Sequence, residues 1–225
     1  LWHGRSQTTG FHPEVIPPLV DQIGDVLDTL GIARAHIGGQ SLGGWVAMRF
    51  ALAHPSRLDK LVLTTPMGYQ PDAGSVPPHP EQDMAKLRES SLAVLRDPSW
   101  DNIRVRLERI VTDKSLITDE AIAVRHAFYN DAAVNAVQRE LVTNYLGGDA
   151  PRKHRITDAI AADIKAPTLV YWGDDNSPPP PVGERLASRI PGAEFFSAPK
   201  TGHWAQFENY EIWNDRVTRF LSGKA

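Results

Sequence analysis

The chain has 225 residues, of which 41% are hydrophobic and 23% are charged, so it can bury a sizeable core as one domain or as a domain with an insertion. Its formal net charge is −3 without any basic block, and nucleic acids and anionic membranes are therefore not expected as partners. The absence of cysteine excludes disulfides and thiolate metal sites, and no apolar run reaches the length of a membrane span. We expect a soluble, cytoplasmic protein that acts on a small molecule, with no metal and no cofactor. Whether it forms a homo-oligomer is left open.

The first predicted element is an amphipathic helix over residues 17–30, where apolar residues recur at three- and four-residue spacing. A short strand at 34–37 and a small, apolar helix at 45–52 follow. A second buried strand is expected at 58–65. This alternation of helix and strand is typical of a parallel sheet.

The next stretch, residues 66–80, is rich in proline and is expected to be a linker. From residue 81 to about residue 145 the apolar spacing is helical throughout. We therefore expect a helical cap over residues 66–163, inserted into an α/β core that consists of residues 1–65 and 164–225.

The sheet resumes in the apolar segment 166–172, which precedes a short helix at 182–190. A last strand at 193–197 and a closing helix at 210–221 complete the pattern. The predicted fold class is α/β, a parallel sheet with helices on both faces and an inserted helical cap. No strand is predicted before the first helix, and we expect that N-terminal strands are missing from this chain.

The chain is organised around Gly39-x-Ser41-x-Gly43, which lies between the first predicted strand and the apolar helix. This is the pattern of a nucleophile elbow, in which a serine occupies a sharp strand-to-helix turn and exposes its hydroxyl. Glycines are expected on either side because the backbone of such a turn passes close to itself. The alternative is an ordinary Gly-Ser turn.

A serine hydroxyl needs an adjacent imidazole as base, and the imidazole needs a carboxylate that fixes its tautomer and stabilises its cation. In a strand, elbow and helix arrangement the order along the chain is serine, acid, histidine. The sequence supplies Ser41, then the pair Asp174 and Asp175, then His203, each just after a predicted strand. We interpret these residues as a catalytic triad.

The chain resembles the α/β-hydrolase superfamily in three segments, Gly39-Gln40-Ser41-Leu42-Gly43, residues 167–174 and Gly202-His203-Trp204. The likeness covers nearly the whole chain. Within it the chain looks closest to the meta-cleavage product hydrolases, serine-dependent enzymes that cut a carbon–carbon bond in vinylogous 1,5-diketones formed by aromatic ring cleavage. The segments that suggest this are 202–208 and Thr118-Asp119-Glu120 leading to Arg125. The resemblance implies an α/β-hydrolase fold and such an activity.

The resemblance also implies roles for residues outside the triad. Arg125 would bind the dienoate end of the substrate and Trp204 would line its pocket, whereas the plain interpretations are a solvated helix arginine and a core aromatic residue. Gln40, inside the elbow, is a further candidate for substrate binding. The backbone amide of Leu42, directly after the nucleophile, is expected to be one oxyanion donor.

The chain departs from the family at the acid. The family places it three residues after the glycine of Trp-Gly, where this chain has Asn176. A loop about one residue shorter would move Asp175 into the role, so the expected triad is Ser41, Asp175 and His203. Asp174 is the second choice, and Asp72, after the preceding strand, is the third.

The chain also has no counterpart of the segment that donates the second oxyanion amide. His3-Gly4-Arg5-Ser6 instead resembles the family's later Gly-His-Gly-x-Ser segment, with Trp2 in place of its first glycine. Two alternatives remain beside the carbon–carbon bond hydrolase. One is a carboxylesterase or lactonase with the same triad, because fold and triad do not fix the substrate. The other is a non-catalytic, hydrolase-like binding protein.

Overall fold

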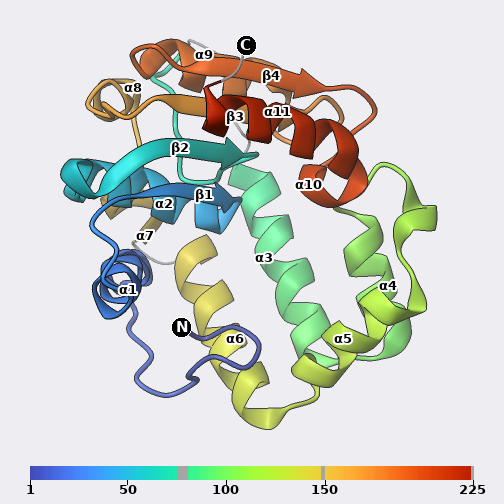
Figure 1. Ribbon diagram of the computed structural model, residues 1–225. Helices are drawn as coiled ribbons and strands as arrows, with labels where there is room; N and C mark the ends of the chain where they lie inside the picture. The colour runs from blue at the N-terminus through green and yellow to red at the C-terminus, as the bar shows by residue number, and fades with distance from the viewer. Residues whose placement is uncertain (75–80, 148–149, 224–225) are drawn as a thin grey trace. The chain divides into compact units, whose positions relative to one another are not determined.

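The computed structural model describes residues 1–74, 81–147 and 150–223, and a run of helices separates its second strand from its third (Figure 1). The four strands are β1 Ala35–Gln40, β2 Leu58–Thr64, β3 Thr168–Gly173 and β4 Glu194–Ala198. The helices are α1 Ile16–Thr29, α2 Leu42–Ala53, α3 Glu81–Arg96, α4 Trp100–Glu108, α5 Asp119–Tyr129, α6 Ala132–Gly147, α7 Ala150–Lys153, α8 Asp158–Ala161, α9 Pro180–Arg189, α10 Ala205–Glu208 and α11 Tyr210–Ser222. Short 3₁₀ turns occupy Pro55–Arg57 and Lys114–Leu116.

The chain divides into two compact units. The helical unit consists of residues 1–19 and 79–153, and the sheet unit consists of residues 20–78 and 154–225. Each unit is described separately below.

The sheet unit contains one sheet with the strand order β1-β2-β3-β4, and every neighbouring pair is parallel. Leu63 of β2 pairs with Gly39 on one side and with Val170 on the other. The carboxyl ends of all four strands therefore lie along the same edge of the sheet, where ligands bind in parallel α/β folds. The predicted parallel sheet is confirmed, and the loops after β1, β3 and β4 begin at this edge.

Helices cover both faces of this sheet, because side chains along each strand alternate between the faces. On one face, Val217 of α11 packs against Val62 and Leu169. On the other face, Trp172 of β3 lies against Gly183 of α9, where an added Cβ would come within 2.3 Å of the indole. Figure 1 shows α2 and α11 on opposite sides of the strands. The predicted α/β class with helices on both faces is confirmed.

The helical unit includes the first residues of the chain, which pack among its helices. Trp2 is 1% exposed and belongs to a core cluster with Val15, Val137 and Leu141. Its carbonyl accepts a hydrogen bond of 2.5 Å from Nε2 of Gln138. Trp2 has a φ of 61°, the left-handed region that favours glycine, which is the residue the resemblance expects at this position. The contacts thus place residues 1–19 with the helices, whereas we had expected them in the hydrolase core.

In the expected cap interval, residues 66–163, the described residues form helices, turns and a single parallel bridge that pairs Tyr69 with Ile156. The bridge ties together the segments 67–70 and 154–158, both in the sheet unit. Gln70 donates its amide to the carbonyl of Ile156 at 2.8 Å, and Ile156 donates to the carbonyl of Gly68 at 2.7 Å. These are the segments through which the chain leaves and re-enters the sheet unit, and we call them the crossover pair. Residues 75–80 of the expected linker lie outside the described residues.

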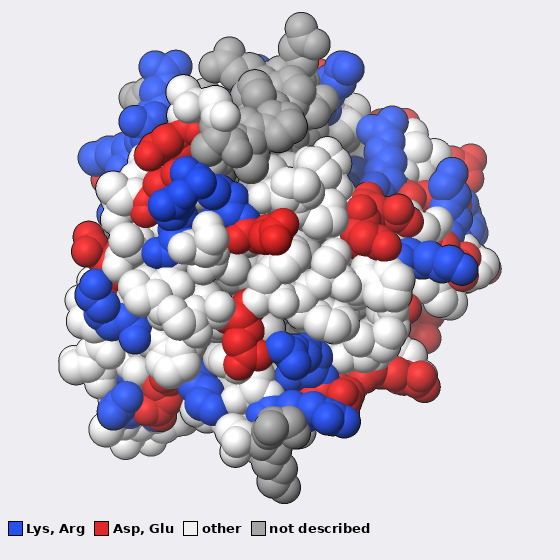
Figure 2. Space-filling view, turned by 90° about the horizontal axis from the view of Figure 1, so that it is seen from above, with Lys and Arg blue, Asp and Glu red and all other residues white. Residues whose placement is uncertain are grey.

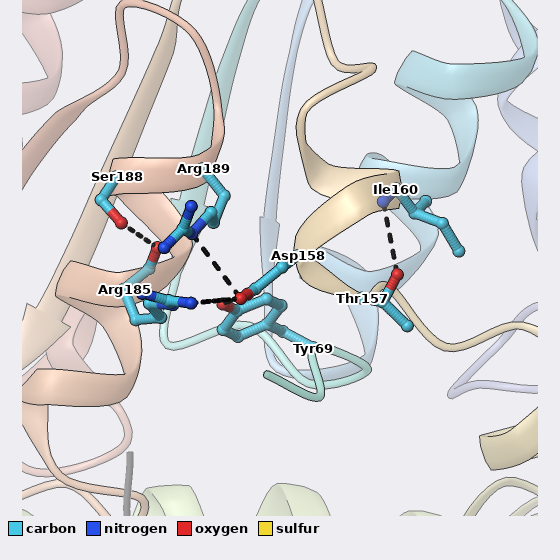
Figure 3. Close-up of polar contacts among 7 residues, drawn as sticks. All are labelled: Tyr69, Thr157, Asp158, Ile160, Arg185, Ser188 and Arg189. Atoms are coloured by element: carbon cyan, nitrogen blue, oxygen red, sulfur yellow. Dashed lines mark hydrogen bonds and ion pairs between the residues drawn. The ribbon is translucent and has the colours of Figure 1, made fainter. Parts of the chain in front are cut away.

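A carboxylate fixes this crossover pair to α9 (Figure 3). Tyr69 donates its hydroxyl to Oδ1 of Asp158 at 2.5 Å, and Arg185 donates to Oδ2 from Nε at 3.1 Å and from Nη2 at 2.5 Å. Arg189 adds a longer ion pair of 3.6 Å. Burial alone would raise the pKa of Asp158, but the hydrogen bonds from Arg185 and Tyr69 outweigh it and lower that pKa. A buried carboxylate with these partners is stabilising while it is ionised.

The surface turned towards the viewer in Figure 2 carries basic and acidic side chains side by side rather than in separate fields. Ion pairs of the described residues include Arg34 with Asp59 at 2.8 Å and Arg57 with Asp28 at 2.8 Å. Pairs as exposed as these contribute little to stability. Among the residues that the structure describes, no helix is both long and apolar enough to span a membrane.

We predict that Asp158→Asn lowers the free energy of unfolding by about 2 kcal/mol, because Arg185 loses an ionised partner in a partly buried site. Since the pKa of Asp158 is lowered by folding, its contribution is present above the ordinary pKa and disappears as the pH falls through the lowered value. Urea unfolding at pH 7 and pH 3 measures both effects. The matched control is Asp163→Asn, whose exposed carboxylate lies 4.0 Å from Lys165. If both variants lost the same free energy of unfolding, the stabilising role of Asp158 would be contradicted.

Candidate active site

Ser41 lies alone between β1, which ends at Gln40, and α2, which begins at Leu42. Its φ of 53° and ψ of −119° are unusual for a residue with a side chain, because a Cβ is crowded at positive φ. Its amide donates to the carbonyl of Thr64 at 3.2 Å, and its carbonyl accepts from Met67 at 2.9 Å and from Trp45 at 3.2 Å. The surrounding backbone therefore holds Ser41 in the strained conformation that the elbow prediction required.

The backbone segments of this turn lie so close together that two positions have no room for a side chain. One of them is a glycine of the motif, and the other is a glycine just outside it. A Cβ on Gly39 would lie 2.2 Å from the carbonyl oxygen of Gly43, so no larger residue fits there. A Cβ on Gly44 would lie 2.6 Å from Cβ of Pro66. No atom stands within 4 Å of a Cβ built on Gly43. The expectation of steric crowding on both sides of Ser41 thus holds for Gly39 but not for Gly43, and the crowded position is the next residue, Gly44.

The backbone amide of Leu42 is the first of α2, and the first amides of a helix have no acceptor within it. Among the described residues, no hydrogen bond uses this amide. The positive end of the helix dipole adds to its effect on a nearby negative charge. An oxyanion that forms on Ser41 would meet such a donor, and the oxyanion role of Leu42 stays a prediction.

Two side chains from β1 and from the end of β2 hold the loop that carries His203. Gln40 donates from Nε2 to the backbone carbonyl of His203 at 3.1 Å, and Thr65 donates from Oγ1 to the same carbonyl at 2.9 Å. Thr65 is buried and has a φ of 39°. Gln40 is thus used to position His203, and its expected contact with a substrate stays a prediction.

The imidazole of His203 is hydrogen-bonded to an amide. Its Nδ1 lies 2.8 Å from Oδ1 of Asn176, a residue that is 5% exposed. The other end of the same amide, Nδ2, donates to the carbonyl of Pro178 at 2.8 Å. A carbonyl oxygen only accepts hydrogen bonds, so the amide must turn its NH₂ group towards Pro178 and its oxygen towards His203. His203 therefore carries its proton on Nδ1, which leaves Nε2 as the basic nitrogen.

The prediction that Asp175 contacts His203 is wrong, because Asn176 occupies that place. The backbone N–H of Asn176 donates to the carbonyl of Gly173 at 3.2 Å and closes a turn after β3. Asp175 bonds to the carbonyl of Thr201 through its backbone amide at 3.0 Å, and its side chain is exposed.

The two other candidates for the acid lie elsewhere. Asp174 accepts the amide of Thr201 on Oδ1 at 3.1 Å, so its carboxylate fixes the loop that follows β4. Asp72 is exposed in the segment after Tyr69. The residue that faces His203 is the one that the family spacing indicated and that we rejected because it is an amide.

Ser41, Asn176 and His203 all belong to the sheet unit, at the edge formed by the carboxyl ends of its strands. The hydroxyl of Ser41 makes no hydrogen bond among the described residues, so its contact with Nε2 of His203 stays a prediction. Trp204 stacks on Phe207, with ring centroids 4.6 Å apart. Arg125 belongs to α5 of the helical unit. The expected substrate contacts of Trp204 and Arg125 likewise stay predictions.

Thr65 and Glu208 are positioning residues that the sequence did not reveal. Glu208 accepts the amide of Gly202 on Oε1 at 2.9 Å, next to His203. Both side chains bond to backbone groups and not to reacting atoms. Such residues belong to no catalytic motif by which the sequence could identify them. Among residues 1–74, 81–147 and 150–223, no group of three or more His, Asp and Glu side chains is arranged to hold a metal ion.

We predict that the Nδ1 proton of His203 is visible by ¹⁵N–¹H NMR as a slowly exchanging signal, because it is bonded to a buried amide oxygen. A His203→Gln variant assigns the signal. Asn176→Ala should abolish the slow exchange and Asp175→Asn should preserve it. If Asp175→Asn abolished the slow exchange and Asn176→Ala preserved it, the assignment of Asn176 would be refuted.

Comparison with known proteins supports the fold and points to a group of relatives. The family model of the alpha/beta hydrolase fold matches residues 3–210. A 2-hydroxy-6-oxononadienedioate/2-hydroxy-6-oxononatrienedioate hydrolase of Burkholderia vietnamiensis is 36% identical over 200 residues, 87% of this chain and 65% of the relative. The protein of the same name from Paraburkholderia phymatum is 37% identical over 199 residues, again 87% and 65%. This chain thus spans slightly less than two thirds of the length of these relatives.

Solved structures agree with this result. A serine hydrolase from the polyaromatic hydrocarbon-degrading bacterium Cycloclasticus zankles superposes with a TM-score of 0.82 and 25% identity, over 99% of this chain and 77% of that one. A 2-hydroxy-6-oxo-6-phenylhexa-2,4-dienoate hydrolase from Rhodococcus sp. strain RHA1 gives a TM-score of 0.80 at 23% identity, over 95% and 74%, which supports the fold alone. With its parallel sheet, its strained serine elbow and a family match over residues 3–210, this chain belongs to the alpha/beta hydrolase fold family.

Proposed function

We propose that this protein is a serine-dependent hydrolase that cleaves a carbon–carbon bond in a vinylogous diketone, the type of compound produced when an aromatic ring is opened by meta-cleavage. The observation that carries the proposal is the 36–37% identity to dienedioate hydrolases over 87% of the chain, combined with a serine in the elbow conformation. The relatives are longer than this chain, so the proposal concerns the whole protein to which these residues belong.

In the proposed mechanism, Nε2 of His203 removes the proton of Ser41 while Oγ attacks the ketone carbon of the substrate. The amide of Leu42 stabilises the resulting oxyanion. When the tetrahedral intermediate collapses, the carbon–carbon bond breaks and its electron pair is delocalised into the dienolate. The dienolate takes up the proton that His203 removed from Ser41, and the imidazole becomes neutral again. Water then hydrolyses the acyl group on Ser41, with His203 again acting as base.

Asn176 supports this mechanism in one respect and weakens it in another. Its oxygen accepts from Nδ1 of His203, so the imidazole is held in the tautomer that makes Nε2 the base. An uncharged amide, however, stabilises the imidazolium less than a carboxylate does. We therefore expect a slower enzyme than one with an aspartate at this position, rather than an inactive one.

A second candidate is a non-catalytic, hydrolase-like binding protein, and the amide of Asn176 is the observation that favours it. We prefer the enzyme because the hydrogen bonds of Asn176 to His203 and to Pro178 give the imidazole its active tautomer, which a binding protein does not require. A carboxylesterase or lactonase would use the same residues, and only the substrate separates it from the first proposal.

We predict that Ser41→Ala removes turnover of a coloured dienoate ketone, because alanine has no hydroxyl that can attack the ketone carbon. Loss of absorbance of the ketone, measured for the full-length protein, reports the activity, and a nitrophenyl ester assayed beside it tests the esterase alternative. Ser188→Ala is the matched control, because within the described part of the chain its hydroxyl bonds only to the carbonyl of Arg185 in α9. A Ser41→Ala variant that kept more than a few per cent of the activity would exclude Ser41 as the nucleophile.

A further inference from the structure

The first segment of the crossover pair, residues 67–70, lies directly against the elbow. The amide of Met67 donates to the carbonyl of Ser41 at 2.9 Å. The residue before it, Pro66, lies so close to α2 that a Cβ added to Gly44 would come within 2.6 Å of the Cβ of Pro66. The segment through which the chain leaves the sheet unit is therefore bonded to the residue that we propose as the nucleophile.

One side chain, that of Trp45 in α2, joins this segment to the other half of the crossover pair. Its ring lies against Gly68, where an added Cβ would stand 2.2 Å from Cγ of the indole. Its Nε1 donates to the carbonyl of His154 at 2.8 Å. Trp45 is only 2% exposed, and all three residues belong to the sheet unit. A single buried indole thus contacts both segments of the pair.

The backbone of Trp45 is bonded to the elbow as well. Its amide donates to the carbonyl of Ser41 at 3.2 Å, so this carbonyl accepts one hydrogen bond from α2 and another from Met67. A carbonyl oxygen has two lone pairs, and here both have a donor. A residue with a side chain keeps a φ of 53°, as Ser41 does, only where its surroundings hold it there. The two bonds to the carbonyl of Ser41 are constraints of this kind.

We propose that Trp45 is a positioning residue for Ser41. Its indole holds the two segments of the crossover pair together and thereby fixes Met67. The amide of Met67 in turn fixes the carbonyl of Ser41, and with it the backbone that directs the hydroxyl. The consequence for catalysis rests on the proposed function, whereas the hold of Trp45 on Met67 does not.

Trp45→Phe tests this assignment, because it keeps an aromatic ring on Gly68 and removes the N–H that bonds to His154. The rate constant for labelling of Ser41 by a saturating fluorophosphonate, measured on the full-length protein, should fall about tenfold, the effect of one weakened hydrogen bond. The half-saturating concentration should not change, because a side chain as buried as Trp45 does not touch the reagent. Partial unfolding would instead lower the fraction of protein that becomes labelled.

Trp213→Phe is the matched control. Trp213 of α11 also donates its Nε1 to a buried acceptor, Oγ1 of Thr64 at 3.0 Å, but α11 lies on the opposite face of the sheet from α2 (Figure 1). Urea unfolding should show a similar loss of stability in both variants, while Trp213→Phe should be labelled at the rate of the unaltered protein. If Trp45→Phe kept that rate, or if both variants were slowed equally, the assignment would be overturned.

A pair of glycines tests the contact of the ring separately. Gly68 and Gly74 have φ values of 82° and 81°, so alanine strains the backbone similarly at both positions. An added Cβ collides with the indole at Gly68, whereas no atom lies within 4 Å of one at Gly74. Gly68→Ala should therefore slow the labelling of Ser41 and Gly74→Ala should not. Equal effects of the two substitutions would show that backbone strain, and not the contact with Trp45, is the cause.

Hydrogen exchange of the Met67 amide measures the same hold without any reaction. This amide should exchange about tenfold faster in Trp45→Phe than in the unaltered protein and should change little in Trp213→Phe. If the amide responded in this way but the fluorophosphonate did not label Ser41, the hold on the elbow would stand and the hydrolase proposal would fail. If Ser41 were labelled equally fast with and without Trp45→Phe, the nucleophile would stand and the role of Trp45 would fail.

Discussion

The close approach of two backbone segments at the elbow is the constraint on which the site depends. Gly39 at the end of β1 lies so near Gly43 that a Cβ would stand 2.2 Å from its carbonyl oxygen. A single residue must therefore connect strand to helix, and Ser41 does so with a φ of 53°. This arrangement places a hydroxyl and the first amides of α2 at the sheet edge where the loops after β3 and β4 begin. The energy of the strained turn is offset by the packing of α2 against the sheet.

A network of neutral hydrogen bonds then places the imidazole. Gln40 and Thr65 fix the backbone of His203 from the ends of β1 and β2, while Asn176 fixes its ring from the loop after β3. Three parallel strands thus contribute one contact each to the same loop. The network selects a tautomer without supplying a negative charge. A carboxylate partner usually both orients the imidazole and stabilises its positive charge. In this site the imidazole is oriented, but no carboxylate stabilises its charge.

Much of the architecture could be predicted from the sequence, because the spacing of apolar residues and the turn residues between strands and helices are local signals. The strand and helix around Ser41 and the parallel sheet were both predictable in this way. The partner of His203 was indicated by the family spacing but not by any local signal, because it depends on how the turn after Gly173 closes and on contacts with Thr201, 27 positions beyond Asp174. The charge of Asp175 favoured the wrong neighbour, whereas the structure selects the residue by backbone hydrogen bonding.

The central claim is that Ser41 is a nucleophile activated by a histidine that an amide, not a carboxylate, holds in place. Its most direct measurement is the rate at which a fluorophosphonate modifies the full-length protein, followed by intact mass and located by peptide mapping. The account predicts a single modification on Ser41, slowed by about 100-fold or more in Asn176→Ala through loss of the oriented base, and little changed in Asp175→Asn. Modification at another serine, or a rate that fell in Asp175→Asn and not in Asn176→Ala, would contradict the account.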